Sequence, residues 1–159
     1  MKIRMVKRGD AEQIRRVALR SWLFAYKGIY KKKTILKMVS SYYSDKELKK
    51  DFDKVAKGKA EFAVALSSGK IIGYAQAGFE KKRWEVLRIY VDPKFARKGI
   101  GTKLLKQIEV FLRKKKAKEY LIYPHNENKI AVGFYNKYGF IREPKFDRGK
   151  NSPCYLKRV

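Results

Sequence analysis

The sequence has few residues that could form covalent or metal crosslinks. It contains one cysteine, Cys154, and one histidine, His125, among 159 residues. A lone cysteine excludes an internal disulfide framework and leaves no cysteine cluster for zinc. We therefore expect no bound metal. We also expect Cys154 to be a small buried side chain and His125 to be a loop residue rather than a catalytic base.

Long hydrophobic runs are also missing. No window approaches the roughly 18 consecutive apolar residues of a membrane-spanning helix. Residues 1–14 lack the apolar run that follows the basic residues of a secretory signal. We expect a cytoplasmic protein with no membrane partner. Its 45% hydrophobic and 14% aromatic content fits a single folded domain over residues 1–159.

Acidic residues are scarce relative to basic ones. The chain has 15 Asp and Glu residues and 41 Lys and Arg residues, which gives a net charge of +26. Such a chain attracts polyanions: nucleic acid, acidic proteins or a phosphate-rich cofactor. Alternatively, because 29 of the 41 cations are lysine, the charge is the solvated surface typical of proteins from hot environments. The runs Lys31–Lys33 and Lys114–Lys116 are then solvated faces.

Apolar periodicity predicts strands and helices in alternation. The first half is expected to hold a strand at 3–6, a helix capped by Asp10, a helical region at 34–56, and strands at 60–66, 71–79 and 84–91. Ser44 and Glu47 have the spacing of a capping box, so the helical region is expected to divide there. The three strands are expected to form an antiparallel meander, which Asp92 and Pro93 end.

The second half begins with the clearest helical pattern of the chain, from Ile100 to Leu112. A strand at 119–124, a helix at 128–138 ended by Gly139, and two strands after Phe140 complete the prediction. The pattern indicates an α+β fold of the three-layer α/β type. It has one mixed, mostly antiparallel sheet of about seven strands, flanked by about four helices.

One glycine turn predicts an anion site. In "VDPKFARKGIGTKLL", residues 91–105, Gly99 and Gly101 join a strand end to a helix start. The first N–H groups of a helix have no partners, and the helix dipole adds positive charge there. The turn lacks the Gly-Lys-Ser/Thr of a phosphate-binding P-loop, and Leu104 occupies the third glycine position of the dinucleotide fingerprint. A glycine turn with no ligand is the alternative.

A second motif, "NKIAVGFYNKYGF" at residues 128–140, gives the turn a context. Together the two motifs resemble the GNAT family of N-acetyltransferases. That family has [RQ]-x-x-G-x-[GA] after a V-x-P strand end, and later N-x-x-A-x-x-[LF]-Y-x-x-x-G-F. The second pattern is matched by Asn128, Ala131, Phe134, Tyr135, Gly139 and Phe140. The first departs at Ala96, which stands in the Arg/Gln position beside Arg97. The order of elements also fits the acyl-CoA N-acyltransferase fold over the whole chain.

The resemblance implies direct acetyl transfer from acetyl-CoA to an amine. The cofactor contacts that it implies are Ile89, Tyr90, Val91, Arg97, Lys98, Gly99, Ile100, Gly101, Thr102, Asn128 and Tyr135. A backbone N–H near Leu87 to Ile89 would polarise the acetyl carbonyl. Tyr135 would be the general acid for the departing thiolate, or else a core aromatic residue. Glu85 would be the base, or else a solvated strand glutamate, and Asn128 could instead cap its helix.

The acceptor amine is expected to meet the aromatic segment "SWLFAYKGIY", residues 21–30. It is similar to the spermidine/spermine N-acetyltransferase branch, and Trp22, Tyr26 and Tyr30 could form a wall for an alkylammonium group. Ordinary helix packing is the alternative. Because a +26 protein repels polycations, a polyamine site would need local carboxylates, for which the candidates are Glu12, Glu61 and Glu85.

Two rival functions remain open at this stage. A lysine or N-terminal amine of a protein is the rival acceptor. A non-catalytic module that binds nucleic acid without specificity is the alternative of another class, against which the intact Asn128 and Tyr135 motif argues. Monomer and homodimer are both compatible with the sequence.

Overall fold

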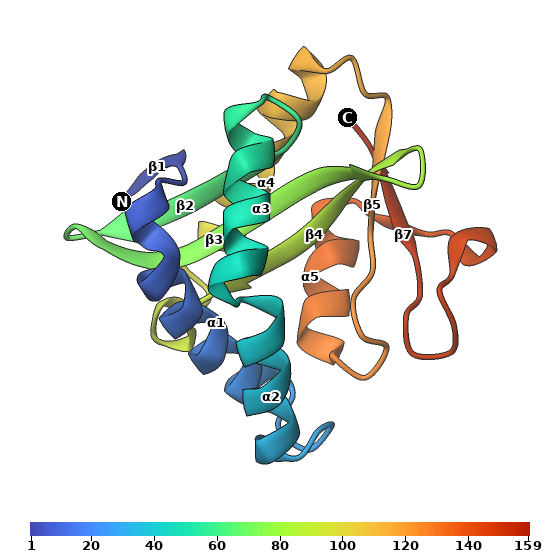
Figure 1. Cartoon of the computed structure of the whole chain (residues 1–159). Helices are drawn as coiled ribbons and strands as arrows, with labels where there is room; N and C mark the ends of the chain where they lie inside the picture. The colour runs from blue at the N-terminus through green and yellow to red at the C-terminus, as the bar shows by residue number, and fades with distance from the viewer.

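The computed structural model describes residues 1–159 as one seven-stranded sheet between two layers of helices (Figure 1). The strands are β1 (Lys2–Met5), β2 (Glu61–Ser67), β3 (Lys70–Glu80), β4 (Arg83–Val91), β5 (Glu119–Ile122), β6 (Ile141–Arg142) and β7 (Tyr155–Arg158). The helices are α1 (Ala11–Ala25), α2 (Lys32–Tyr42), α3 (Asp45–Ala56), α4 (Ile100–Lys114) and α5 (Lys129–Tyr138).

The sheet has the order β1-β2-β3-β4-β5-β7-β6. All neighbours are antiparallel except β4 and β5, which are parallel and joined through α4. The predicted mixed, mostly antiparallel sheet of seven strands is therefore confirmed, as is the meander of β2, β3 and β4. The last strand lies between β5 and β6, which the order of the elements in the sequence does not reveal.

Each face of the sheet has its own core because alternate residues of a strand point to opposite faces. On β2, Phe62 and Val64 pack beneath α1, α2 and α3. Ala63 and Ala65 face α4 and α5 on the other side. All four of these side chains are fully buried, as is Cys154, so the expectation for the cysteine is confirmed.

The predicted division of the helical region at Ser44 is confirmed. Its Oγ accepts the Glu47 N–H at 3.2 Å, so α2 and α3 are separate and the helices number five. Asp10 is the N-cap residue of α1, as predicted, but its side chain makes no capping hydrogen bond to this helix. Its carboxylate accepts the Lys7 N–H at 2.7 Å and pairs with Arg4 at 2.7 Å, and so it closes the short 3₁₀ turn before the helix.

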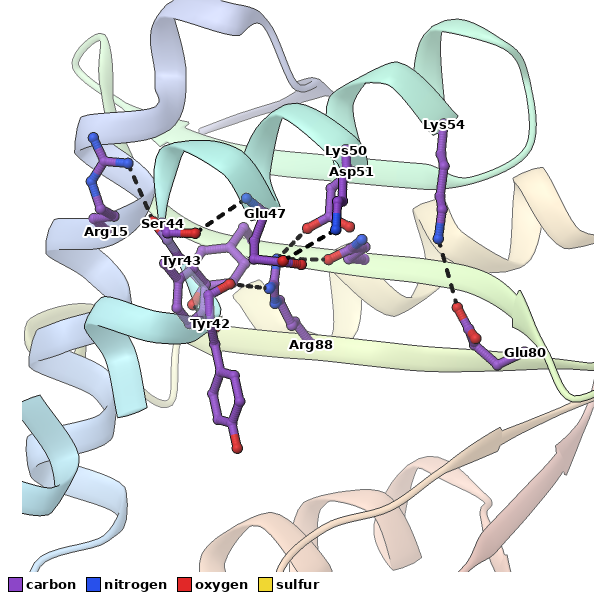
Figure 2. Close-up of polar contacts among 12 residues, drawn as sticks. Arg15, Tyr42, Tyr43, Ser44, Glu47, Lys50, Asp51, Lys54, Glu80 and Arg88 are labelled. Atoms are coloured by element: carbon purple, nitrogen blue, oxygen red, sulfur yellow. Dashed lines mark hydrogen bonds and ion pairs between the residues drawn. The ribbon is translucent and has the colours of Figure 1, made fainter. Parts of the chain in front are cut away.

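Arg88 connects the α2–α3 junction to the sheet (Figure 2). Its guanidinium donates to the Tyr42 carbonyl at 2.6 Å and to Asp51 Oδ2 at 2.8 Å, and it lies 4.3 Å from the Tyr43 ring centroid. Hydrogen bonds to charged groups are stronger than those between neutral groups, and this guanidinium is mostly buried. The side chain therefore fixes the end of α2 relative to β4.

The β3–β4 hairpin turns at Lys81 and Lys82, as expected. Both residues have positive φ, 47° and 65°. Such two-residue turns usually carry Asn-Gly or Asp-Gly, because other L-residues lose roughly 1–2 kcal/mol in the left-handed region. This turn thus holds two cations at its tip in a conformation that lysine does not favour.

None of the five helices is both long enough and apolar enough to cross a membrane. No group of three or more His, Cys, Asp or Glu side chains is placed to hold a metal ion.

Candidate active site

The site begins where β4 and β5 separate. Their parallel pairing involves only Glu85 with Leu121 and Val86 with Ile122. Strand β5 then ends, whereas β4 continues to Val91, and Figure 1 shows the two chains diverging beyond this contact. The diverging segment of β4 therefore has a backbone edge with no neighbouring strand.

The ladder between β3 and β4 determines which backbone groups face this gap. Asp92 donates its N–H to the Ile72 carbonyl at 2.8 Å. Because hydrogen-bonded and non-hydrogen-bonded pairs alternate in antiparallel strands, the backbone of Tyr90 faces β3, and that of Ile89 and Val91 faces the gap. The Val91 carbonyl already accepts from Ser21 Oγ at 3.1 Å. The N–H of Val91 and both backbone polar groups of Ile89 remain directed into the gap.

A β-bulge interrupts β4 at the same place. Gln76 pairs with Arg88 and Ala77 pairs with Val86, so Leu87 has no partner on β3. The extra residue of a bulge is left out of the ladder and changes the direction of the strand. The bulge lies at the start of the segment, Leu87 to Ile89, in which a backbone N–H is expected to polarise the acetyl carbonyl.

The loop before α4 has the geometry of an anion-binding nest. Arg97 and Gly99 both have positive φ, 61° and 74°. No backbone carbonyl accepts from the N–H groups of residues 97–102. Successive N–H groups in alternating right- and left-handed conformations form a concave site for an anion, and a helix start adds its dipole. The side chains of Arg97 and Lys98 are exposed beside it.

The two glycines of this loop have different structural roles. A Cβ on Gly99 would meet nothing within 4 Å, so its positive φ is what favours glycine there. A Cβ on Gly101 would lie 3.1 Å from Cζ of Phe134, so its missing side chain lets α5 pack against α4. Ala96 is exposed at the end of a 3₁₀ turn.

Helix α5 places a buried phenol near the gap. Asn128 caps this helix, because its Oδ1 accepts the Ala131 N–H at 3.2 Å, which confirms the capping interpretation. Tyr135 is 6% exposed, and its hydroxyl makes no hydrogen bond within the protein. Burial, with the neighbouring phenol of Tyr26 adding to it, raises the pKa of Tyr135 well above 10.0. The Tyr26 and Tyr90 hydroxyls lie 3.0 Å apart.

Glu85 is neither solvated nor free. It is 5% exposed, and its two oxygens each accept from Arg148 at 2.8 Å. The Arg148 guanidinium also lies 4.0 Å from the centroid of the Tyr123 ring. The interpretation of Glu85 as a solvated strand residue is therefore wrong, and an amine would have to compete with Arg148 for its oxygens.

An aromatic cleft of about 370 Å³ opens beside these residues. Its lining consists of Trp22, Tyr26, Tyr30, Met38, Tyr42, Tyr123, His125, Arg148, Asn151 and Ser152. Ring centroids lie 5.6 Å apart between Tyr26 and Tyr30 and again between Tyr30 and His125. The aromatic residues expected from the segment 21–30 are therefore brought together as a wall.

The other cleft residues were missed because they come from α2 and from distant loops. His125 is in a loop, as expected, yet it faces the cleft, and Arg148 and Asn151 come from the loop before β7. Two carboxylates suggested for this region, Glu12 and Glu61, do not line the cleft. Glu12 is on the outer surface of α1, and Glu61 is buried beside Gln107.

The sequence model of the acetyltransferase (GNAT) family matches residues 18–140. The chain belongs to this family. It is therefore an acetyl-CoA-dependent N-acetyltransferase, and the predicted family and fold are confirmed. The match runs from the middle of α1 through the meander and the anion loop to beyond the end of α5.

Individual relatives agree with this assignment. The chain is 29% identical over 144 residues, 88% of each protein, to spermidine N(1)-acetyltransferase of Thermoplasma acidophilum. It is 28% identical, with a TM-score of 0.93, to the crystal structure of PaiA N-acetyltransferase from Thermoplasma acidophilum in complex with coenzyme A. That match covers 99% of this chain and 98% of the other. A GNAT acetyltransferase of Staphylococcus aureus Mu50 shares the fold at 13% identity, with a TM-score of 0.77 and coverage of 99% and 98%.

Proposed function

We propose that this N-acetyltransferase acetylates a terminal primary amine of an aliphatic polyamine such as spermidine. The observation that carries the proposal is the aromatic cleft at the open side of the β4–β5 gap. Tyr26 connects it to β4 through Tyr90, and Arg148 connects it to β4 through Glu85. Aromatic faces attract alkylammonium groups and cover their methylene stems. The similarity to a protein named spermidine N(1)-acetyltransferase supports the same acceptor class.

The rings would replace the carboxylates expected of a polyamine site. No acidic side chain lines the cleft, and its one full charge is that of Arg148. A cation held over ring faces gains roughly 0.5–2 kcal/mol per contact, depending on desolvation. Exchange of Arg148 for the substrate ammonium on Glu85 would remove the remaining repulsion. Glu85 is the only one of the three proposed carboxylates that pairs with a residue of the cleft lining.

For the cosubstrate, we assign the pyrophosphate to the loop at residues 97–102. Its backbone N–H groups are unpaired, and the space over Gly99 is open, so the residues present fit a phosphate group. Ile89 and the Val91 N–H would pair with the pantetheine arm as an added strand does. The backbone of Tyr90 cannot take part because it faces β3, which leaves only its phenol. The relative solved with coenzyme A supports a site in this fold.

The chain's own groups would carry the proton transfers. Bound acetyl-CoA supplies the acetyl group as a thioester, whose C–S bond breaks as the amide C–N bond forms. Tyr135 would donate its phenolic proton to the departing thiolate and regain it from solvent. Its raised pKa keeps it protonated at neutral pH, and the same burial raises the proton affinity of a thiolate beside it.

The base must remove a proton from an amine that is almost entirely in its ammonium form at neutral pH. With a pKa near ~10.4, only about one primary amine in a thousand is neutral at pH 7. We propose that Glu85 takes the proton once the ammonium displaces Arg148 from one oxygen. The N–H of the bulge at Leu87 would polarise the acetyl carbonyl. A protein amine is the rival acceptor, which the +26 charge favours through acidic partners.

Removing one ring of the wall tests the acceptor site. Tyr30→Ala should raise the KM for spermidine about tenfold, because a cation–π contact and a face of the cleft are lost. Tyr30→Phe keeps the ring and should stay within about twofold of the native KM. Steady-state kinetics with saturating acetyl-CoA measures both. An unchanged KM in Tyr30→Ala would place the amine elsewhere.

A further inference from the structure

A second cleft lies at the end of the molecule away from the anion loop. It has a volume of about 540 Å³ and includes Lys54, Lys57, Lys59, Lys115, Phe79, Glu80, Trp84 and Leu87 in its lining. Helix α4 separates the two regions, since its first residues follow the anion loop and Lys115 follows its last. Fifteen helical residues span about 22 Å. The two regions share Leu87 of the β4 bulge, but the active site does not account for the lysines and the aromatic pair of this cleft.

The lysines of this basic cleft converge from two helix ends. Lys57 and Lys59 flank the turn after α3, and the Nζ of Lys115 lies 3.8 Å from the Cβ position of Gly58 in that turn. Figure 1 shows the ends of α3 and α4 side by side at the top of the molecule. Lys54 pairs with Glu80 at 3.9 Å, the contact drawn in Figure 2. The other three lysines form no ion pair.

The charge balance of the cleft favours an anionic ligand. Four lysines and one glutamate give a net charge of +3. Two helix C-termini contribute about −0.5 each, which leaves roughly +2. The nearby hairpin tip adds Lys81 and Lys82, both held at positive φ. The hairpin therefore adds two further positive charges beside the cleft.

An aromatic pair with one exposed ring lines the same cleft. Phe79 is 55% exposed, and its ring centroid lies 5.2 Å from that of Trp84. Trp84 in turn packs edge-on against Phe111, which supports the pair from beneath. A phenyl ring that is held from below and exposed above is a stacking platform. Lysines around an aromatic platform are the arrangement that binds single-stranded nucleic acid, with phosphates on the cations and a base on the ring.

We propose that this basic cleft binds single-stranded nucleic acid. Backbone phosphates contact Lys57, Lys59 and Lys115, and one base stacks on Phe79. A nucleotide uses both features at once, because its phosphate meets the lysines while its flat base stacks on the exposed phenyl ring, so the combination favours nucleic acid over an acidic protein. The three lysines and Phe79 take no part in the acetyl transfer that we propose, so the test does not depend on the proposed acceptor.

Binding of a fluorescently labelled oligothymidylate, followed by anisotropy over a salt series, tests the proposal. Contacts of the three unpaired lysines with three phosphates should give a slope near −2 in log K against log salt. The triple change Lys57→Glu, Lys59→Glu and Lys115→Glu should weaken binding at least about tenfold. Phe79→Ala should weaken it about fivefold or more, with little change in the slope. Thermal melts and acetyl-CoA binding show that each variant is folded.

The matched control changes another exposed lysine run by the same charge. Lys31→Glu, Lys32→Glu and Lys33→Glu also lower the net charge from +26 by 6 to +20, but at the start of α2. The affinity of this variant for the oligonucleotide should stay within about threefold of the native affinity, and the loss of overall charge explains that small change. An equal loss in both triple variants would contradict the site, because the overall charge would then explain binding. Competition by polyaspartate as strong as by oligothymidylate, with Phe79→Ala neutral, would contradict nucleic acid as the ligand.

Discussion

Replacement of Tyr135 with phenylalanine should lower kcat by about 100-fold or more. General acid catalysis contributes roughly 10²–10⁴ to a rate, and Phe keeps the ring that packs against Phe140 while removing the proton donor. Because the phenol makes no hydrogen bond within the protein, its loss leaves no partner unsatisfied. The KM for acetyl-CoA should therefore change little. Initial rates of thiol release at saturating substrates measure the effect.

Tyr138→Phe is the matched control on the same helix. It removes a hydroxyl that lies about one turn closer to the C-terminal end of α5. The ring lies against Lys157 and does not line the aromatic cleft. It should retain kcat within about twofold, since no proton transfer depends on it. If Tyr135→Phe kept the native kcat with an unchanged thermal midpoint, Tyr135 would be a core aromatic residue only.

Gly99→Asp should weaken acetyl-CoA binding by at least about 100-fold. The added carboxylate would lie in the loop that we assign to pyrophosphate. Two unit charges about 5 Å apart at an effective dielectric constant of 20 repel by roughly 3 kcal/mol, which is more than a factor of 100. The fold should tolerate the change, because a Cβ at Gly99 meets nothing within 4 Å and Asp is among the residues that accept positive φ.

Gly99→Asn separates charge from shape in this experiment. Asn has the same size as Asp and also accepts the left-handed region, but it carries no charge. Its binding loss should stay below about tenfold, and isothermal titration with acetyl-CoA compares the two variants directly. Equal affinities in the Asp and Asn variants would mean that no phosphate lies near Gly99.

Local sequence signals predicted most of the fold. The apolar periods placed all seven strands and the helices, and the Ser44 cap divided the helical region as predicted. These features depend on residues close together in the chain. Asp10 occupies the predicted N-cap position, but its side chain does not cap α1 because Arg4 and the Lys7 N–H already occupy its carboxylate. Propensity alone does not show that competition. The place of β7 between β5 and β6 depends on pairing between distant segments.

The candidate site was predictable only in part, for the same reason. The glycine loop and the Asn128–Tyr135 helix are continuous motifs, and the structure places them on either side of the β4–β5 gap. The pairing of Glu85 with Arg148 joins residues 63 positions apart, and no local pattern marks it. The cleft wall combines α1, α2 and two later loops, so Tyr123 and Arg148 could be found only in the folded chain.

Incubation of the protein with acetyl-CoA and spermidine, with mass spectrometry of the amine and a parallel free-thiol assay, tests the proposed reaction most directly. We expect one acetyl group on a terminal amine of spermidine and one free thiol for each acetyl group transferred. Acetyl-CoA binding with no acetylated spermidine, while a lysine peptide is acetylated, would contradict the proposed acceptor and support a protein substrate.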